Sequence, residues 1–295
     1  MSGHEHWQMD ASTPELYERY LVPAITSIWA ADLLDRIALK PHESVLDVAC
    51  GTGAVIRLAA QQRHSGRLAG IDLNSGMLGV ARSMPLNGAP IEWHEGSALD
   101  LPFPAASFDV VLCQLGLQFF PDRPLALRQM ARVLRPGGRA GMSVYSAIER
   151  TPAAHAFVQA LDKHLGPDAS RTKRAEHIFP DPEEVRSLVE EAGFEDVEVT
   201  TVAKQINFPS MLDYVRFQLM ATPMATLIKD RDDARRDQVI AAIASDAASC
   251  LDPAMLQNGR LTFPQESHVA IAVLPRETAK SSLTAPRPDV PRDRA

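Results

Sequence analysis

Short apolar runs alternate with amphipathic segments along the first half of the chain. Apolar and β-branched runs at 44–49, 67–72, 91–95, 108–114 and 139–145 predict strands, and helical periodicity returns at 54–62, 75–84 and 123–134. Strands that alternate with helices form right-handed βαβ units, which cover both faces of a mainly parallel sheet. The pattern therefore predicts a doubly wound α/β fold.

The rhythm changes after Ser146. A helical stretch at 152–164 precedes a helix that opens with Asp181-Pro182-Glu183-Glu184 and closes at Gly193. Alternation at 196–208 predicts an edge strand, and 261–274 is expected to be its antiparallel partner. With the five earlier strands, these predict a Rossmann-like, mainly parallel seven-stranded sheet with an antiparallel edge strand.

Further segments flank or interrupt this sheet. An N-terminal helical cap is expected at 1–40, with an interruption near Pro23. The core comprises 41–208 and 260–275, and a helical insertion occupies 209–259 with helices at 210–228 and 232–249. Because the last twenty residues are rich in Pro, Arg, Ser and Asp, 276–295 is expected to be a disordered tail.

Composition and charge limit the kinds of partner that we expect for this chain. The 295 residues are 45% hydrophobic and carry a formal net charge of −7, which would repel a phosphate backbone and makes nucleic acid an unexpected partner. The basic cluster of Arg171, Lys173 and Arg174 beside Glu176 is interpreted as a solvated loop. No basic leader or run of 18 apolar residues is present, so we expect a soluble, cytoplasmic protein without a membrane span.

No metal site is expected. The three cysteines are Cys50, Cys113 and Cys250, and none of them forms a CxxC pair. His4 and His6 form an HxH pattern at the chain terminus, where no further ligand follows nearby. We therefore interpret this segment as a frayed chain terminus.

A glycine turn follows the first predicted strand. Gly51 and Gly53 allow a sharp turn and close approach of a ligand, and Asp72, at the end of the second strand, can accept both hydroxyls of a ribose. A dinucleotide fingerprint needs a third glycine at position 56, where this chain has Ile56. A nucleoside ligand without phosphates, S-adenosylmethionine, satisfies both observations.

Five ordered motifs between Val45 and Tyr145 carry a resemblance. They are VLDVACGTG (45–53), GIDLNSGML (70–78), EGSALDLPFP (95–104), SFDVVLCQLGLQFF (107–120) and MARVLRPGGRAGMSV (130–144). The segment resembles the class I S-adenosylmethionine-dependent methyltransferases of the ubiquinone and menaquinone biosynthesis type. The resemblance implies the cofactor S-adenosyl-L-methionine and methyl transfer, but says little about the acceptor.

The resemblance also implies a role for individual residues. It places the Ala49 and Gly51 backbone at the methionine end of the ligand, Asp72 at the ribose, and Leu73 and Met77 against the adenine. Ser97 and the Ala98 amide are expected at the polar edge of the adenine. Many members have an aspartate where this chain has Ser97, and the exchange replaces a charged acceptor by a neutral one.

Two further polar residues belong to the expected cofactor site. Asp47 lies inside the first strand, where it either accepts bonds from the glycine loop or is a structural acid satisfied by nearby amides. Gln114 lies at the carboxyl end of its strand, where open α/β sheets bind ligands. We expect Gln114 beside the sulfonium or the amino-acid end.

Methyl transfer mainly requires alignment and exclusion of water. If the acceptor is a hydroxyl or an acidic carbon, a general base helps. The candidates are His155, Tyr145 and Tyr20, with His164 and Tyr17 as further ones. For each of them, structural packing is the alternative interpretation.

The insertion bears on the acceptor. Its first helix has a wide apolar surface made by Met211, Leu212, Tyr214, Val215, Phe217, Leu219, Met220 and Met224. A lid over a small lipophilic acceptor, such as a quinone, polyketide or terpenoid, is one interpretation, because methionine makes adaptable walls. Core packing and a homodimer interface are the alternatives.

Three function classes stay open at this point. The leading hypothesis is methyl transfer to oxygen or carbon of a small lipophilic metabolite. The second is a non-methylating enzyme on the same fold, such as a cyclase, which Ser97 and the lack of an obvious base favour. The third is a ligand-binding protein without activity.

Overall fold

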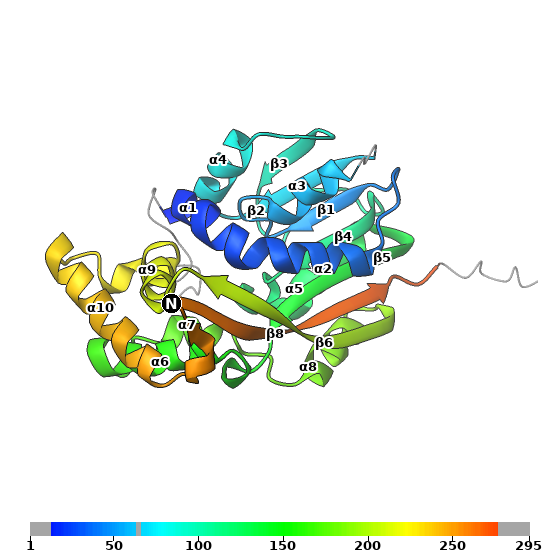
Figure 1. Cartoon of the computed structure of the whole chain (residues 1–295). Coiled ribbons are helices and arrows are strands. Elements are labelled where there is room, and N and C mark those ends of the chain that lie inside the picture. Colours follow the sequence, from blue (N-terminus) through cyan, green and yellow to red (C-terminus); the bar gives the residue numbers. More distant parts are fainter. Residues whose placement is uncertain (1–12, 63–65, 277–295) are drawn as a thin grey trace, which may run out of the picture.

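The computed structural model describes residues 13–62 and 66–276, and Figure 1 shows them around one mixed sheet. The strand order is β3-β2-β1-β4-β5-β8-β6. The bounds are β1 Val45–Val48, β2 Leu68–Asp72, β3 Ile91–Glu95, β4 Phe108–Gln114, β5 Leu134–Tyr145, β6 Glu195–Phe208 and β8 Arg260–Val273. Strands β1 to β5 pair in parallel, whereas β8 pairs antiparallel with both β5 and β6. The predicted doubly wound fold with an antiparallel strand pair at one edge is confirmed.

The sheet differs from the prediction in two details. A two-residue strand, β7 (Leu256–Gln257), adds a short hairpin on β8. Strand β5 begins at Leu134 rather than at Arg139, because the register against β4 shifts where the chain passes through the left-handed Gly137. Neither change alters the order of the strands.

Successive residues of the central strands face opposite sides of the sheet, as the two-residue period of a strand requires. Val45 and Val110 pack with α2 (Ser27–Ile37) and α3 (Ala54–Gln61), whereas Leu46 and Val111 pack with α5 (Arg123–Val133) and α8 (Pro182–Glu191). Helix α4 (Ser75–Ser83) contacts β2 and β3. Because both faces are covered, the central strands consist almost entirely of buried apolar residues.

The N-terminal segment is helical from Thr13 to Ile37, so the predicted interruption near Pro23 is wrong. It consists of α1 (Thr13–Leu16), the π-helical η2 (Tyr17–Thr26) and α2. Proline lacks a backbone N–H and its ring crowds the preceding turn of an α-helix, and the wider π-helical turn tolerates both. The first helix of the chain therefore continues past its proline.

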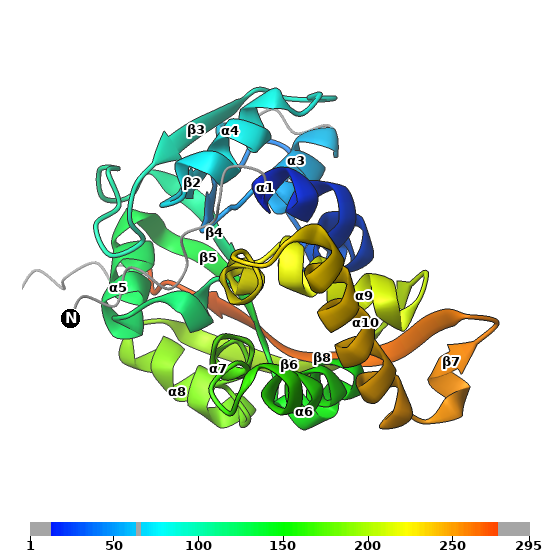
Figure 2. The same ribbon diagram turned by 90° about the vertical axis from the view of Figure 1, so that its left-hand side faces the viewer.

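The insertion contains α9 (Met211–Met220), η5 (Pro223–Leu227), α10 (Asp233–Ser249) and η6 (Pro253–Met255). Figures 1 and 2 show α10 beside α6 (Pro152–Leu165) and α9, and α9 also contacts α1 and η2. Phe208, the last residue of β6, pairs with Leu261 of β8, so both ends of the insertion meet at one point.

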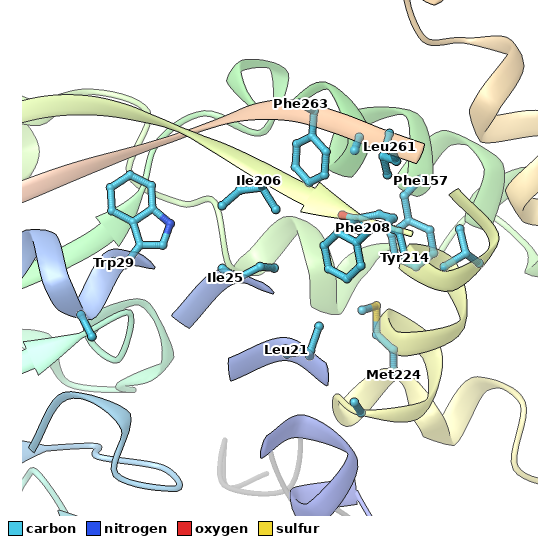
Figure 3. Packing of buried hydrophobic residues seen from close by; sticks show 14 of the residues in the cluster. Leu21, Ile25, Trp29, Phe157, Ile206, Phe208, Tyr214, Met224, Leu261 and Phe263 are labelled. Atoms are coloured by element: carbon cyan, nitrogen blue, oxygen red, sulfur yellow. The ribbon is translucent and has the colours of Figure 1, made fainter. Parts of the chain in front are cut away.

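Much of the apolar surface of α9 is packed inside the protein. Tyr214 has 2% of its surface exposed and lies edge-on to the rings of Phe157, Phe208 and Phe263. Figure 3 shows this aromatic cluster facing Leu21 of η2. Core packing, one of the three interpretations of this helix, accounts for its buried residues.

No helix in the described part of the chain is long and apolar enough to cross a membrane. His4 and His6 and nearly all of the predicted tail lie outside the described residues.

Candidate functional site

The turn between β1 and α3 holds left-handed backbone at Ala49, Gly51 and Gly53, with φ angles of 57°, 57° and 82°. A Cβ on Gly53 would lie 2.3 Å from the ring of Trp93, whereas a Cβ on Gly51 would meet no atom within 4 Å. Gly53 is therefore required by packing beneath the turn. Gly51 leaves space above the turn, which a ligand can approach closely.

Asp72 ends β2 and is held against this turn. The Gly51 N–H donates to its Oδ2 at 2.7 Å, and the Asn74 N–H donates to its Oδ1 at 2.8 Å. Burial raises the pKa of the carboxyl, and these backbone hydrogen bonds oppose the rise. Each carboxylate oxygen has a second lone pair, so the carboxylate can also accept two ribose hydroxyls.

Asp47 is buried in β1 beneath the turn, with 1% of its surface exposed. The pKa of this carboxyl is raised to about 8, mainly by burial. A backbone hydrogen bond from Ile56 opposes the rise, and the charge of Asp72 adds to it. Within the described residues, Oδ2 has no hydrogen-bond partner. A carboxyl in this state has one oxygen left to interact with a ligand.

The residues expected around the adenine lie on two neighbouring loops. Leu73 is 53% exposed, whereas Met77 is buried in α4. The Asn74 side chain caps the first turn of α4, where its Oδ1 accepts from the Met77 N–H at 3.1 Å. The Ser97 hydroxyl accepts from the Leu99 N–H at 3.1 Å. Ala98 follows Ser97 in the loop after β3.

Gln114 links the end of β4 to the N-terminal helix. Its Nε2 donates to the Thr26 carbonyl at 3.0 Å, while its buried Oε1 has no partner among the described residues. The next residue, Leu115, has a left-handed φ of 52°. The amide is therefore fixed by its nitrogen, with its oxygen left as an acceptor.

These groups surround one cavity of about 300 Å³ at the carboxyl ends of β1, β2 and β4. This is where open α/β sheets bind their ligands, and the volume is typical of a small-molecule site. Of the residues predicted for the cofactor, those that line the cavity are Asp47, Ala49, Gly51, Asp72, Leu73, Met77, Ser97, Ala98 and Gln114. Gly53 lies behind the turn, against Trp93.

The other half of the cavity is built by segments that contain none of the predicted cofactor residues. Residues of η2, of the segment after β4, of the end of β5, of α7 (Arg171–Ala175) with the residue that follows it, and of the insertion line it together. They include Tyr17, Leu21, Ile25, Gln118, Phe119, Phe120, Pro121, Tyr145, Lys173, Glu176, Gln218, Thr222 and Pro223. This half combines apolar walls with a small set of buried polar groups.

The sequence interpretation of Lys173 as a solvated loop residue is wrong. Lys173 and Glu176 are 5% and 8% exposed, and Lys173 Nζ donates to Glu176 Oε2 at 2.6 Å inside the cavity wall. Arg171 is solvated as expected, in a pair with Asp168. A five-residue helix gives too short a periodicity to show which of its cations faces inward.

The candidate bases are distributed unevenly around the cavity. Tyr145 and Tyr17 line it, whereas Tyr20 stacks on Phe217 with ring centroids 4.1 Å apart. His155 lies in α6 outside the cavity, with Nε2 3.2 Å from the Gln159 amide nitrogen. His164 also lies outside it, 2.5 Å from Asp246.

Tyr145 is held in a buried polar environment. Its ring stacks on His177 with centroids 5.0 Å apart, and Lys173 Nζ lies 5.8 Å from its centroid. Burial and the nearby charge of Glu176 raise the pKa of Tyr145 well above its ordinary value. At neutral pH Tyr145 therefore carries a hydroxyl rather than a phenolate.

Comparison with known proteins agrees with this arrangement. Residues 20–207 match the ubiE/COQ5 methyltransferase family. A 2-phytyl-1,4-naphtoquinone methyltransferase of Thermosynechococcus vestitus is 34% identical over 181 residues, covering 58% of this chain and 80% of that protein. A demethylmenaquinone methyltransferase of Staphylococcus carnosus is 31% identical over 184 residues, covering 58% and 76%.

A solved structure extends the likeness of the fold beyond the matched residues. The phosphoethanolamine N-methyltransferase 2 of Haemonchus contortus, in complex with phosphomonomethylethanolamine and S-adenosylhomocysteine, aligns with a TM-score of 0.60 at 18% identity. The alignment covers 94% of this chain and 61% of that one. Together with the cavity at the glycine turn, these findings show that the chain belongs to the ubiE/COQ5 methyltransferase family and is an S-adenosylmethionine-dependent methyltransferase.

Proposed function

We propose that this methyltransferase acts on a small lipophilic ring compound of the quinone class, bound in the half of the cavity that faces η2 and the insertion. The observation that carries the proposal is the continuity of the cavity, which joins the cofactor residues to an apolar wall. The similar proteins from Thermosynechococcus vestitus and Staphylococcus carnosus are named for such acceptors.

The cofactor half, which is the part of the cavity lined by the predicted cofactor residues, offers hydrogen-bonding groups that fit S-adenosylmethionine. Asp72 would hold the ribose, the open face of Gly51 would admit the ligand, and Asp47 Oδ2 and Gln114 Oε1 are acceptors without a partner among the described residues. When bound, the cofactor supplies a methyl group on a positively charged sulfur. The protein positions the acceptor and excludes water.

The acceptor half would be closed by the insertion. Gln218, Thr222 and Pro223 line the cavity from α9 and η5, while Leu21 and Ile25 line it from η2. Burying an apolar ring against such residues is favourable by about 25 cal/mol per Å² of apolar surface. We propose that this part of the insertion is the lid, while its deeper residues anchor it to the core.

The test is transfer of a labelled methyl group. The full chain is incubated with methyl-labelled S-adenosylmethionine and 2-phytyl-1,4-naphthoquinone, oxidised or reduced, with Asp72→Ala as control. We expect label in the organic extract, an equal amount of S-adenosylhomocysteine, and little of either with the control. Tight binding of this acceptor without either product would instead support a non-methylating reaction.

Absence of both binding and transfer for lipophilic ring compounds would contradict the proposed acceptor class. Three expectations stay predictions from the sequence: that nucleic acid is not a partner, that the chain can form a homodimer, and that the protein is cytoplasmic. A mobility-shift assay tests for binding of nucleic acid, and analytical ultracentrifugation of the purified chain tests for a homodimer.

A further inference from the structure

The Lys173–Glu176 pair is buried in the cavity wall with part of its hydrogen-bonding capacity unused. Within the described residues, one side-chain hydrogen bond is recorded for each member, the 2.6 Å bond that joins them. An ammonium has three donors and a carboxylate about four acceptor sites. Removing two charges from water is unfavourable unless further hydrogen bonds complete the pair. A ligand in the cavity can supply those bonds.

Two glutamines give an independent sign of a polar ligand in the same half. Gln118 is 3% exposed and both of its amide atoms lack partners among the described residues. Gln218 is 2% exposed and its Oε1 also lacks one there. Both line the cavity, where a buried amide without a hydrogen-bond partner is unfavourable until a partner arrives.

The neighbouring titratable groups are poor proton acceptors. Burial is the main cause that raises the pKa of Tyr17, Tyr145 and Tyr214, and the charge of Glu176 adds to each rise, so all three keep their protons at neutral pH. His177 donates from Nδ1 to the Ser146 carbonyl at 2.8 Å and does not line the cavity. Among the described ionisable residues of this half, Glu176 is the carboxylate available to an acceptor.

We propose that Glu176 accepts a hydrogen bond and then the proton from an acceptor hydroxyl, while Lys173 donates to the same oxygen. This deepens the proposed function and rests on it: the acceptors would be neutral phenol- or enol-type compounds rather than amines. A neutral ion pair offers a donor and an acceptor side by side, which matches a hydroxyl. A protonated amine would meet the Lys173 ammonium.

The proton transfer balances the methyl transfer. The hydroxyl proton moves to the Glu176 carboxylate, and the electron pair left on the oxygen, or on a ring carbon conjugated with it, forms the new bond to the methyl carbon. The sulfur keeps the pair of the broken carbon–sulfur bond. After attack by oxygen, the Glu176 carboxyl releases its proton to solvent. After attack by carbon, the displaced ring proton leaves to solvent and the Glu176 carboxyl returns its proton to the oxygen.

Binding tests this assignment without turnover. The full chain, saturated with S-adenosylhomocysteine, is titrated with 1-naphthol, 1-methoxynaphthalene and 1-(aminomethyl)naphthalene, an amine that is protonated at neutral pH. We expect wild type to prefer 1-naphthol by roughly ten- to a hundredfold, the equivalent of one hydrogen bond to a charged group. In Glu176→Gln the preference should fall to roughly threefold or less, because the proton has lost its charged acceptor.

Matched variants separate recognition from folding. The double variant Lys173→Met/Glu176→Gln leaves no unpaired buried charge and should also lose the preference. Asp168→Asn removes the carboxylate charge from the exposed Asp168–Arg171 pair, as Glu176→Gln does from the buried one, and should behave as wild type. For transfer to reduced 2-phytyl-1,4-naphthoquinone, we expect Glu176→Gln to lose roughly 10²–10⁴ in rate and Glu176→Asp to recover part of it.

An unchanged preference for 1-naphthol in Glu176→Gln and in the double variant would overturn the inference and leave the proposed function standing. Failure of wild type to bind any of the three probes while it binds S-adenosylhomocysteine is a different result. It would remove the proposed acceptor site, and the inference with it.

Discussion

Asp72 shows how one side chain can both shape the cofactor site and bind in it. Its oxygens accept from Gly51 and Asn74, so Asp72→Ala removes a charged acceptor without opening the core. We expect S-adenosylhomocysteine affinity to fall about ten- to a hundredfold by calorimetry. Glu95→Ala is the control, because Glu95 is the exposed register partner of Asp72 on β3. Equal losses in both variants would argue against a ribose at Asp72.

Asp47 couples cofactor binding to protons. Because its pKa is raised to about 8, most of its carboxyls are protonated at pH 7 in the free protein. The positive charge of S-adenosylmethionine favours the carboxylate, so binding should release protons, and affinity should rise as the pH approaches 8. Calorimetry in buffers of different ionisation enthalpy measures this release. Asp47→Asn should abolish it, and a wild type that releases no proton would contradict the assignment.

The same group makes stability depend on pH. The raised pKa means that the folded protein binds the Asp47 proton more tightly than the unfolded chain, whose carboxyl keeps its ordinary value of 3.8. This contribution is fully present below the ordinary pKa and is lost as the pH rises through about 8. Thermal unfolding should therefore show wild type losing more stability than Asp47→Asn between pH 6 and pH 9. Parallel profiles would contradict it.

Single residues also mark the limit of the sequence analysis. The glycine turn and Asp72 could be predicted because their backbone geometry needs particular residue types. Lys173, Glu176, Gln118 and Gln218 could not, because their burial depends on how distant elements pack. A polar side chain looks the same in the sequence whether it faces water or a cavity.

At the scale of elements, α9 is an anchor as well as a wall of the cavity. We expect Tyr214→Ala to lower the free energy of unfolding by about 3–5 kcal/mol, the range for removal of a large buried aromatic side chain. Leu212→Ala, at a side chain 38% exposed on the same helix, should cost about 1 kcal/mol or less. Denaturant unfolding compares the two. Similar costs would show that the aromatic cluster does not hold α9.

Elements with a long, clear period were predictable and irregular ones were not. The strands of the core and α8, which opens at an Asp-Pro cap, lie within a few residues of their predicted bounds. The π-helical η2 was missed because proline signals an interruption, and only contacts made after folding show that the helix continues. The wide apolar face of α9 was predicted, but a pattern of residues does not show whether the core, a ligand or a second subunit covers it.

At the scale of the whole molecule, two ligands should protect different segments from hydrogen exchange. S-adenosylhomocysteine alone should slow exchange at 49–53 and 72–77, and added 1-naphthol should slow it further at 117–121 and 218–223. Helix α8 is the internal control, because it packs on the opposite face of the sheet from α2 and α3. Protection by 1-naphthol at 72–77 alone would place the acceptor in the cofactor half.

The meeting of Phe208 with Leu261 has a consequence for how such enzymes diversify. A loop whose ends are neighbours can be exchanged for another of different length while the scaffold around it keeps its form. The stretch between these residues lies beyond the family match, which ends at residue 207, yet it supplies Gln218, Thr222 and Pro223 to the cavity. A descendant could thus inherit the cofactor machinery intact and acquire a new chemical preference by replacing one continuous piece of gene.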